Sequence, residues 1–254
     1  MNFPPLTYLL LFFAGLVGGF IDSIAGGGGL ITVPALLAAG LPPQVALGTN
    51  KFQSCFGTMV AAVSYARAGL MKTPGLAYAA GLAFFASVGG ALTVTVLDKE
   101  ILRLAIPWML AIVTVYTTLN RKFGIDPGHA RMSSMLFAIL FGIVLGFYDG
   151  FFGPGTGSFW TVALVALLGL ELRSATGYTK AVNLCSNLGA LVIFLFSGSV
   201  SFAAGGAMIA GQLLGAKLGS GLAIRKGAGF IRPIFLAVVF AMTVKLLWDA
   251  MSSN

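Results

Sequence analysis

Charged residues are scarce in this chain, and their scarcity excludes an ordinary soluble domain. They make up 9% of the 254 residues, against 58% hydrophobic residues, whereas a soluble domain carries about 25% charged residues. Several apolar runs exceed the roughly 18 residues that mark a transmembrane helix. The chain is therefore expected to be an all-α polytopic membrane protein. Residues 1–19 lack the basic start and small-residue cleavage site of a secretory signal, so we interpret them as part of a retained helix.

Histidine and cysteine are almost absent. The single histidine, His129, lies in a charged loop, so no histidine-based metal site or catalytic triad is available. Cys55 and Cys185 fall in apolar segments, where we expect small buried side chains rather than a disulfide. The motifs of nucleotide-binding loops are missing as well. We expect no enzyme activity, no metal and no cofactor.

Acidic residues are also few. The net charge of +8 arises from 15 Lys and Arg against 7 Asp and Glu, and most of the basic residues lie in short loops between apolar runs. A bilayer produces this pattern by itself, so no nucleic-acid partner is needed to explain it.

Glycine, by contrast, is abundant and interrupts two apolar runs. Four consecutive glycines at 26–29 follow Asp22, and a second glycine-rich stretch at 153–157 follows Asp149. Glycine is a poor helix former, so each stretch should break its helix. In a membrane, a broken helix is tolerated only where protein or a wet cavity satisfies its backbone. Two such breaks at corresponding positions indicate a transporter's binding site.

The two breaks belong to a longer internal repeat. The aligned pairs include Gly19 with Gly146, Asp22 with Asp149, Gly26 with Gly153, Gly28 with Gly155 and, after a two-residue gap, Lys51 with Lys180. We expect two repeats, residues 1–124 and 125–254, integrated in one membrane domain. Each should hold a glycine-broken hairpin followed by three transmembrane helices. The expected segments are 6–24, 30–40, 45–67, 74–97 and 101–119, then 134–151, 158–168, 175–196, 202–224 and 230–248.

The loop charges indicate how the hairpins lie in the membrane. If each hairpin crosses the membrane once, five basic loop residues lie on one side of the membrane and six on the other. If each hairpin returns to its starting side, nine lie on one side and three on the other. The nine are Arg67, Lys72, Arg121, Lys122, Arg131, Arg173, Arg225, Lys226 and Arg232, and the three are Lys99, Arg103 and Lys245. The larger asymmetry is the one that cytoplasmic enrichment of Lys and Arg predicts. Five segments per repeat make the second repeat inverted, so the two breaks should approach the midplane from opposite faces.

Each break should also create an anion site. A helix that begins at a glycine presents unpaired N–H groups and the positive end of its dipole. We expect one such terminus at Gly28 and Gly29, and the other at Gly155, Gly157 and Ser158. The alternative is a packing kink where small residues let helices meet. The repetition, with an aspartate before each break, favours the binding site.

Lys51 and Lys180 occupy equivalent positions near the starts of their helices. Each must either snorkel to the interface or face a wet, counter-charged site. Because the positions match and Asn50 and Asn183 lie nearby, we favour an anion pocket.

Asp22 and Asp149 have two interpretations that the sequence leaves open. They could ionise and pair with the lysines, or stay protonated in a low dielectric with a raised pKa, as proton coupling requires. They could instead be structural carboxylates that cap the broken backbone of the glycine turns.

The motifs that carry these residues read GFID at 19–22, AGGGGLITVP at 25–34 and ALGTN at 46–50, with GPGTGSF at 153–159 as the second copy. Together they resemble the sulfite exporter TauE/SafE family of membrane proteins, over nearly the whole chain. The pattern is specific for the family and not for the substrate, since members are linked to sulfite, sulfonates and other small anions. The resemblance implies export across the bacterial inner membrane.

We therefore expect a multi-pass secondary transporter that exports a small anion, with sulfite or a small sulfonate as the leading substrate. The anion should bind between the two broken-helix termini and the two lysines. The alternative is a passive small-anion channel, which would conduct many ions per opening where a carrier shows saturable flux. The expected partners are the anion and the lipid bilayer, and a homodimer is left open.

The charge asymmetry predicts that both termini face the periplasm. Reporter fusions at Asn254 and within residues 121–131 should report opposite sides, with the inner loop cytoplasmic, because nine of the twelve loop charges then lie inside. A cytoplasmic C-terminus would contradict an odd number of segments per repeat.

Overall fold

The computed structural model describes residues 3–97, 129–227, 230 and 233, and the regular structure in these ranges is helical. The helices are α1 (Pro5–Ala25), α2 (Gly29–Ala38), α3 (Pro43–Arg67), α4 (Leu76–Val96), α6 (Ser134–Phe151), α7 (Thr156–Leu168), α8 (Leu172–Phe196) and α9 (Phe202–Lys226). Five of them, α1, α4, α6, α8 and α9, are long and apolar enough to cross a membrane. The protein is therefore a multi-pass membrane protein. The expected segments 101–119 and 230–248 lie largely outside the described residues, as do both chain ends.

The described helices follow the predicted segments closely. α6 coincides with the segment 134–151, and α2, with 10 residues, is too short to span, as predicted. α7 begins at Thr156, two residues before the predicted start, because Gly155 has a φ of 84° and already turns the chain into the helix. α3 is as long as α8, at 25 residues, but its polar side chains continue to its last residue, Arg67, whereas α8 ends in an apolar stretch.

Both glycine stretches break their helices, which confirms that prediction. α1 ends at Ala25, and Gly26 follows with a φ of 78° while its N–H donates to the Asp22 carbonyl at 2.8 Å. In the second stretch Gly153 and Gly155 have φ values of 92° and 84°. These values lie in the left-handed region that favours glycine, so the glycines are required at these turns.

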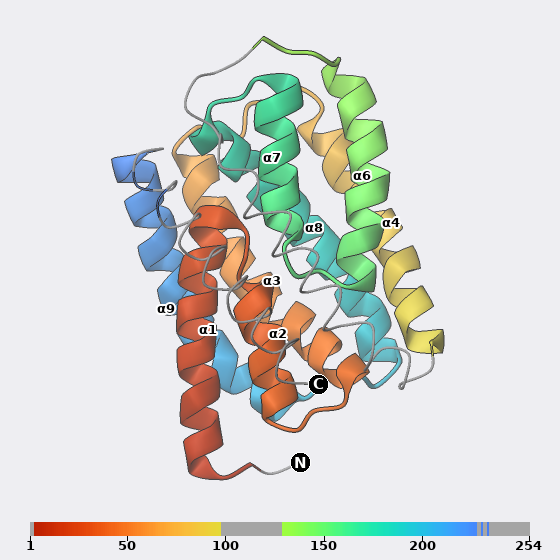
Figure 1. Cartoon of the computed structure of the whole chain (residues 1–254), viewed down its shortest axis with the longest axis vertical. Coiled ribbons are helices and arrows are strands. Elements are labelled where there is room, and N and C mark those ends of the chain that lie inside the picture. The colour runs from red at the N-terminus through yellow and green to blue at the C-terminus, as the bar shows by residue number, and fades with distance from the viewer. Residues whose placement is uncertain (1–2, 98–128, 228–229, 231–232, 234–254) are drawn as a thin grey trace, which may run out of the picture.

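The two breaks lie against each other in the middle of the molecule. In Figure 1, α1 runs upward from the N-terminus and α2 returns downward, whereas α6 runs downward and α7 returns upward. A Cβ atom on Gly26 would lie 2.5 Å from the backbone of Gly157. Ser158 Oγ donates a hydrogen bond of 3.0 Å to the Ala25 carbonyl. The breaks therefore meet directly, backbone against backbone.

The remaining helices pack in corresponding pairs around this contact. α1 packs along α9, and α6 packs along α4. Between these pairs, α3 and α8 contact each other, and α3 also packs against α9 and α8 against α4. Glycines permit the close approach: a Cβ on Gly215 of α9 would lie 2.0 Å from the Leu16 carbonyl, and one on Gly150 of α6 would lie 2.0 Å from the Ser87 carbonyl. Small residues at such crossings are typical of membrane helices.

The outer faces of these pairs are apolar and exposed. Large exposed side chains include Leu9 and Leu10 of α1, Val144 of α6 and Leu218 of α9, as expected for surfaces that contact lipid. The two cysteines are free, as predicted, and Cys55 is buried as expected, whereas Cys185 is only half-buried.

The close contact of α4 and α6 gives a matched test within one helix. Gly90→Ala should lower the free energy of unfolding by about 1–3 kcal/mol, because the new Cβ would lie 2.1 Å from the Phe147 carbonyl. Gly81→Ala, where nothing lies within 4 Å of the new atom, should leave stability unchanged or raise it by up to about 1 kcal/mol. Thermal unfolding in detergent compares the two. Equal effects would contradict the close packing of these helices.

Candidate functional site

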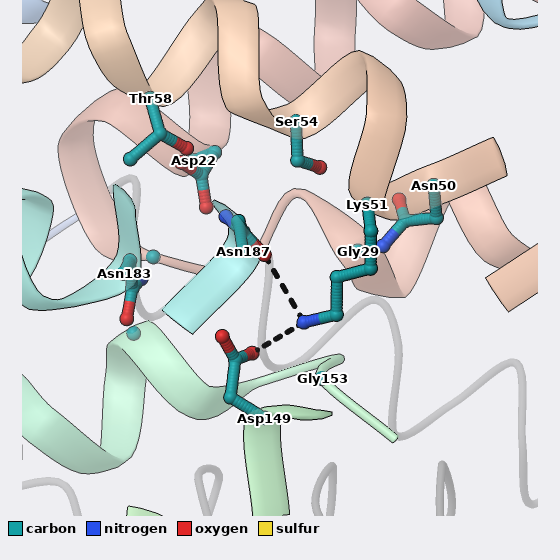
Figure 2. Close-up of a pocket in the computed structure, with 12 residues that line it drawn as sticks. Asp22, Gly29, Asn50, Lys51, Ser54, Thr58, Asp149, Gly153, Asn183 and Asn187 are labelled. Carbon is teal, nitrogen blue, oxygen red and sulfur yellow. Dashed lines mark hydrogen bonds and ion pairs between the residues drawn. The ribbon is translucent and has the colours of Figure 1, made fainter. Parts of the chain in front are cut away.

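A small polar pocket lies where the two breaks meet (Figure 2). Its lining consists of glycines from the breaks and polar side chains from the surrounding helices: Asp22, Gly26, Gly29, Asn50, Lys51, Ser54, Thr58, Asp149, Gly153, Gly157, Asn183 and Asn187. The cavity volume is about 20 Å³, which is enough for about one water molecule. In this conformation the site is polar and small.

Helices α3 and α8 supply most of the polar side chains of the pocket. Asn50, Ser54 and Thr58 are spaced by four residues along α3, so they lie on one face of that helix. Asn183 and Asn187 follow the same spacing on α8. Because α3 and α8 pack against each other, both polar faces reach the same place between the breaks.

Lys51 is buried in this pocket and paired there. Its Nζ lies 2.9 Å from Asp149 Oδ1 and donates a 3.0 Å hydrogen bond to Asn187 Oδ1. The second carboxylate oxygen of Asp149 accepts a short hydrogen bond from Ser186 Oγ. A lysine ammonium has three N–H donors, and two of those of Lys51 are used by Asp149 and Asn187. Within the part of the chain that the structure describes, one donor is therefore left for a further acceptor.

Lys180 is equally buried and makes the corresponding pair. Its Nζ lies 3.0 Å from Asp22 Oδ2 and donates a second, short hydrogen bond to the main-chain carbonyl of Asp22. A positive charge there also stabilises the C-terminal end of α1, where the helix dipole is negative. Lys180 is not among the residues that line the pocket.

The two ion pairs cross between the halves of the chain. Lys51 comes from the first half and pairs with an aspartate of the second, and Lys180 does the reverse. Neither lysine snorkels, since their exposed fractions are 1% and 0%. Of the arrangements considered for the aspartates, pairing with the lysines is the one present in this structure. At the first turn, the Gly26 N–H is satisfied by the main-chain carbonyl of Asp22 and not by its carboxylate.

The structure brings most of the predicted site residues together and sets four of them back from the pocket. Predicted residues that line it are Asp22, Gly29, Asn50, Lys51, Asp149, Gly157 and Asn183, and those that do not are Gly28, Gly155, Ser158 and Lys180. Gly28 is turned toward α1, where a Cβ would lie 2.6 Å from the Gly18 carbonyl. Ser158 uses its hydroxyl to hold the two breaks together.

The helix termini contribute less free backbone to the pocket than the sequence suggested. At the start of α2, the Leu30 and Ile31 N–H groups already donate to the carbonyls of Gly27 and Gly28. At the start of α7, the Ser158 N–H donates to the Gly155 carbonyl. Each helix start therefore borders the pocket through a single glycine, Gly29 or Gly157, and the side chains of α3 and α8 supply the rest.

The pocket residues beyond those predicted for the site are Gly26, Ser54, Thr58, Gly153 and Asn187, and Ser186 lies behind them. Ser54 and Thr58 could have been found from the helical period, because they continue the face of Asn50. Ser186, which holds Asp149, could not be found from the repeat, because the same alignment places Gly57 opposite it in the first half.

Asn50 and Asn183 differ in how fully they are held. Asn50 Oδ1 accepts hydrogen bonds from Thr32 Oγ1 at 2.6 Å and Gln53 Nε2 at 3.0 Å, which fixes the amide and ties α2 to α3. Asn183 is buried, and its Oδ1 has no hydrogen-bond partner within the described part of the chain. A buried amide oxygen without a partner is costly, so this acceptor is open to a hydrogen-bond donor such as a water molecule.

Comparison with known proteins gives consistent results over nearly the whole chain. A family model described as sulfite exporter TauE/SafE matches residues 11–246. The chain is 42% identical over 246 residues to a probable membrane transporter protein, YfcA, of Escherichia coli K12, covering 97% of this chain and 91% of that protein. It is 43% identical over 239 residues to the probable membrane transporter protein ORF9 of a Sinorhizobium species, covering 94% and 92%.

A shorter part of the chain matches a plant protein. Over 90 residues it is 37% identical to the sulfite exporter TauE/SafE family protein 6 of Arabidopsis thaliana, covering 35% of this chain and 19% of that protein. No solved structure matches the chain.

The crossed pairing predicts strong coupling between Lys51 and Asp149. Lys51→Met should lower the free energy of unfolding by about 3–5 kcal/mol, because it leaves the buried carboxylate without its counter-charge. The double variant Lys51→Met, Asp149→Asn should recover most of this loss, because no uncompensated charge remains. Unfolding in detergent measures both effects.

Lys217 of α9, which is exposed, provides the control. Lys217→Met should change stability by less than about 0.5 kcal/mol. If the double variant proves as unstable as Lys51→Met alone, the two side chains do not stabilise each other.

Proposed function

The chain belongs to the sulfite exporter TauE/SafE family, and from this we propose that it exports a small sulfur-containing anion, sulfite or a small sulfonate, as a secondary transporter. The family is one of transporters, so the chain is not an enzyme. The observation that carries the proposal is the buried Lys51 ammonium at the meeting point of the two breaks, with one N–H donor left for a substrate oxygen.

The lining of the pocket suits an oxyanion. A charge-assisted hydrogen bond from lysine is among the stronger contacts that a protein can offer to an anion. The lining also includes the amides of Asn50, Asn183 and Asn187 and the hydroxyls of Ser54 and Thr58, which can donate to further oxygens. Intramembrane ionisable residues in a bundle interior commonly mark a substrate pathway.

We place this site near the midplane of the bacterial inner membrane, at the interface of two inverted repeats with both termini in the periplasm. The opposite directions of α1 and α6 in Figure 1 support this arrangement. So does the packing, since α1 with α9 and α6 with α4 are corresponding pairs under the internal alignment. Broken helices that meet at a repeat interface are the usual position of a transporter's site.

A carrier explains the pocket better than a channel does. Sulfite has four heavy atoms, so it needs far more space than the cavity of about 20 Å³ provides. The lysines are already neutralised by aspartates, so an anion has to rearrange the site as it enters. Such a rearrangement for each ion is the behaviour of a carrier that alternates between two faces.

Binding to the purified protein tests the proposal. Sulfite, sulfate, thiosulfate and methanesulfonate are titrated side by side, and at least one sulfur oxyanion should bind saturably. In proteoliposomes the same anion should show saturable flux and counterflow. Unsaturable conductance would favour the channel.

The double variant Lys51→Met, Asp149→Asn isolates the lysine's part in binding. It removes the ammonium and its counter-charge together, so the net charge of the pocket stays the same. Anion affinity should fall by about one to two decades, which corresponds to the loss of a charge-assisted contact of about 1.5–3 kcal/mol. Lys217→Met should bind like the parent. Unchanged titration curves for the double variant would remove Lys51 from the site.

A further inference from the structure

The two lysine–aspartate pairs correspond under the internal alignment, but their carboxylates have different surroundings. The Asp149 carboxylate is held at both oxygens, by Lys51 at Oδ1 and by Ser186 at Oδ2. Its side chain is 5% exposed. A carboxylate with donors on both oxygens is stabilised in its ionised form.

The Asp22 carboxylate is held at one oxygen only. Lys180 contacts Oδ2, and within the described ranges no hydrogen bond reaches Oδ1. The side chain is 16% exposed and lines the pocket. The position equivalent to Ser186 is Gly57, which has no hydroxyl to offer.

The charges of the site balance when it is empty. Two lysines and two aspartates sum to zero, so a bound monoanion would leave a net negative charge in a buried place. An uncompensated buried charge is strongly unfavourable. The anion would in addition lie in the same small cavity as Asp22, whose carboxylate would repel it.

A proton on Asp22 removes both obstacles. The site with one anion and one added proton again sums to zero, and a protonated carboxyl can donate a hydrogen bond to the anion. Lys180 would keep the main-chain carbonyl of Asp22 as an acceptor. The proton adds to a carboxylate oxygen and is released when the anion leaves, and no covalent bond of the substrate changes.

We propose that Asp22 takes up one proton when an anion binds, whereas Asp149 stays ionised as the fixed counter-charge of Lys51. This inference rests on the proposed anion site. It makes the transport of a monoanion electroneutral, with one proton accompanying each anion.

The other groups around Asp22 are consistent with this assignment. α8 contributes Lys180, α3 contributes Lys51 and Tyr65, and α6 contributes Asp149. Cys55 of α3 lies toward Lys51 and Asp149, and Arg173 of α8 lies toward Tyr65. Arg225 and Lys226 of α9 are exposed. α2 and α7 contain no titratable side chain, and Lys217 of α9 is exposed. Among the described residues, Asp22 is thus the one carboxylate of the pocket with an oxygen free to take a proton.

Calorimetry with methanesulfonate counts the protons. This probe stays a monoanion near neutral pH, so any proton taken up enters the protein. At pH 7.5, titrations in buffers of different ionisation enthalpy should report one proton taken up per anion bound. Affinity should fall about tenfold for each further unit of pH, as linkage to one proton requires. In Asp22→Asn the proton count should be zero and the affinity independent of pH.

Infrared difference spectra identify the carboxyl that is protonated. Adding methanesulfonate to the parent should produce the carbonyl band of a protonated carboxyl, and Asp22→Asn should lack it. Ser186→Ala is the matched control, because it removes a donor from Asp149 and leaves every charge in place. The band should keep its position in that variant if it belongs to Asp22.

The outcomes separate this inference from the proposed function. A band that persists in Asp22→Asn, or shifts in Ser186→Ala, would assign the proton to Asp149 and overturn the inference. Saturable binding by the parent with no proton uptake would overturn it as well and leave the anion site standing. No binding of sulfite, sulfate, thiosulfate or methanesulfonate at any pH would overturn the proposed function, and this inference with it.

Discussion

The crossed ion pairs are the interaction on which the rest of this structure depends. A lysine or an aspartate alone in the interior of a membrane bundle is strongly unfavourable, and removing one partner of a buried pair leaves the other uncompensated. Here each lysine finds its counter-charge in the other half of the chain. Neither half can therefore satisfy its own buried charges, and the charged centre of the bundle exists only when the halves are assembled.

Glycine makes this arrangement sterically possible at two levels. Left-handed glycines let α1 and α6 stop in the middle of the bundle, beside the aspartates that end them. Other glycines bring the backbones of the two breaks, and of the paired helices, within the distance of a single Cβ atom. Without these contacts the lysines of α3 and α8 would not reach the opposite carboxylates. The abundance of glycine thus permits the close packing that brings each lysine to its aspartate.

Much of this could be predicted from the sequence, for reasons that also explain what could not. The breaks follow from local chemistry, since four glycines in a row, or three glycines and a proline within five residues, strongly disfavour a helix. The repeat drew attention to Lys51, Lys180 and both aspartates. The partner of each lysine was not predictable, because pairing depends on how the halves dock. Gly28 was unpredictable for the same reason. Its position before α2 predicted backbone N–H groups facing an anion, whereas it packs against Gly18 of α1.

The duplication also explains why the two pairs could diverge. In a strictly symmetric site both carboxylates would have the same surroundings, and neither could serve as a fixed charge while the other changed its state. One hydroxyl alters this: Ser186 holds Asp149 at its second oxygen, while its counterpart Gly57 offers nothing and packs instead against Gln212 of α9. The structure thus holds two ion pairs that correspond under the internal alignment. Under our proposal, the difference of one side chain keeps Asp149 ionised and leaves Asp22 able to take up a proton. Under that proposal the site stays neutral both empty and loaded, because the Lys51–Asp149 pair keeps the cation in place and a proton on Asp22 balances the charge of the anion.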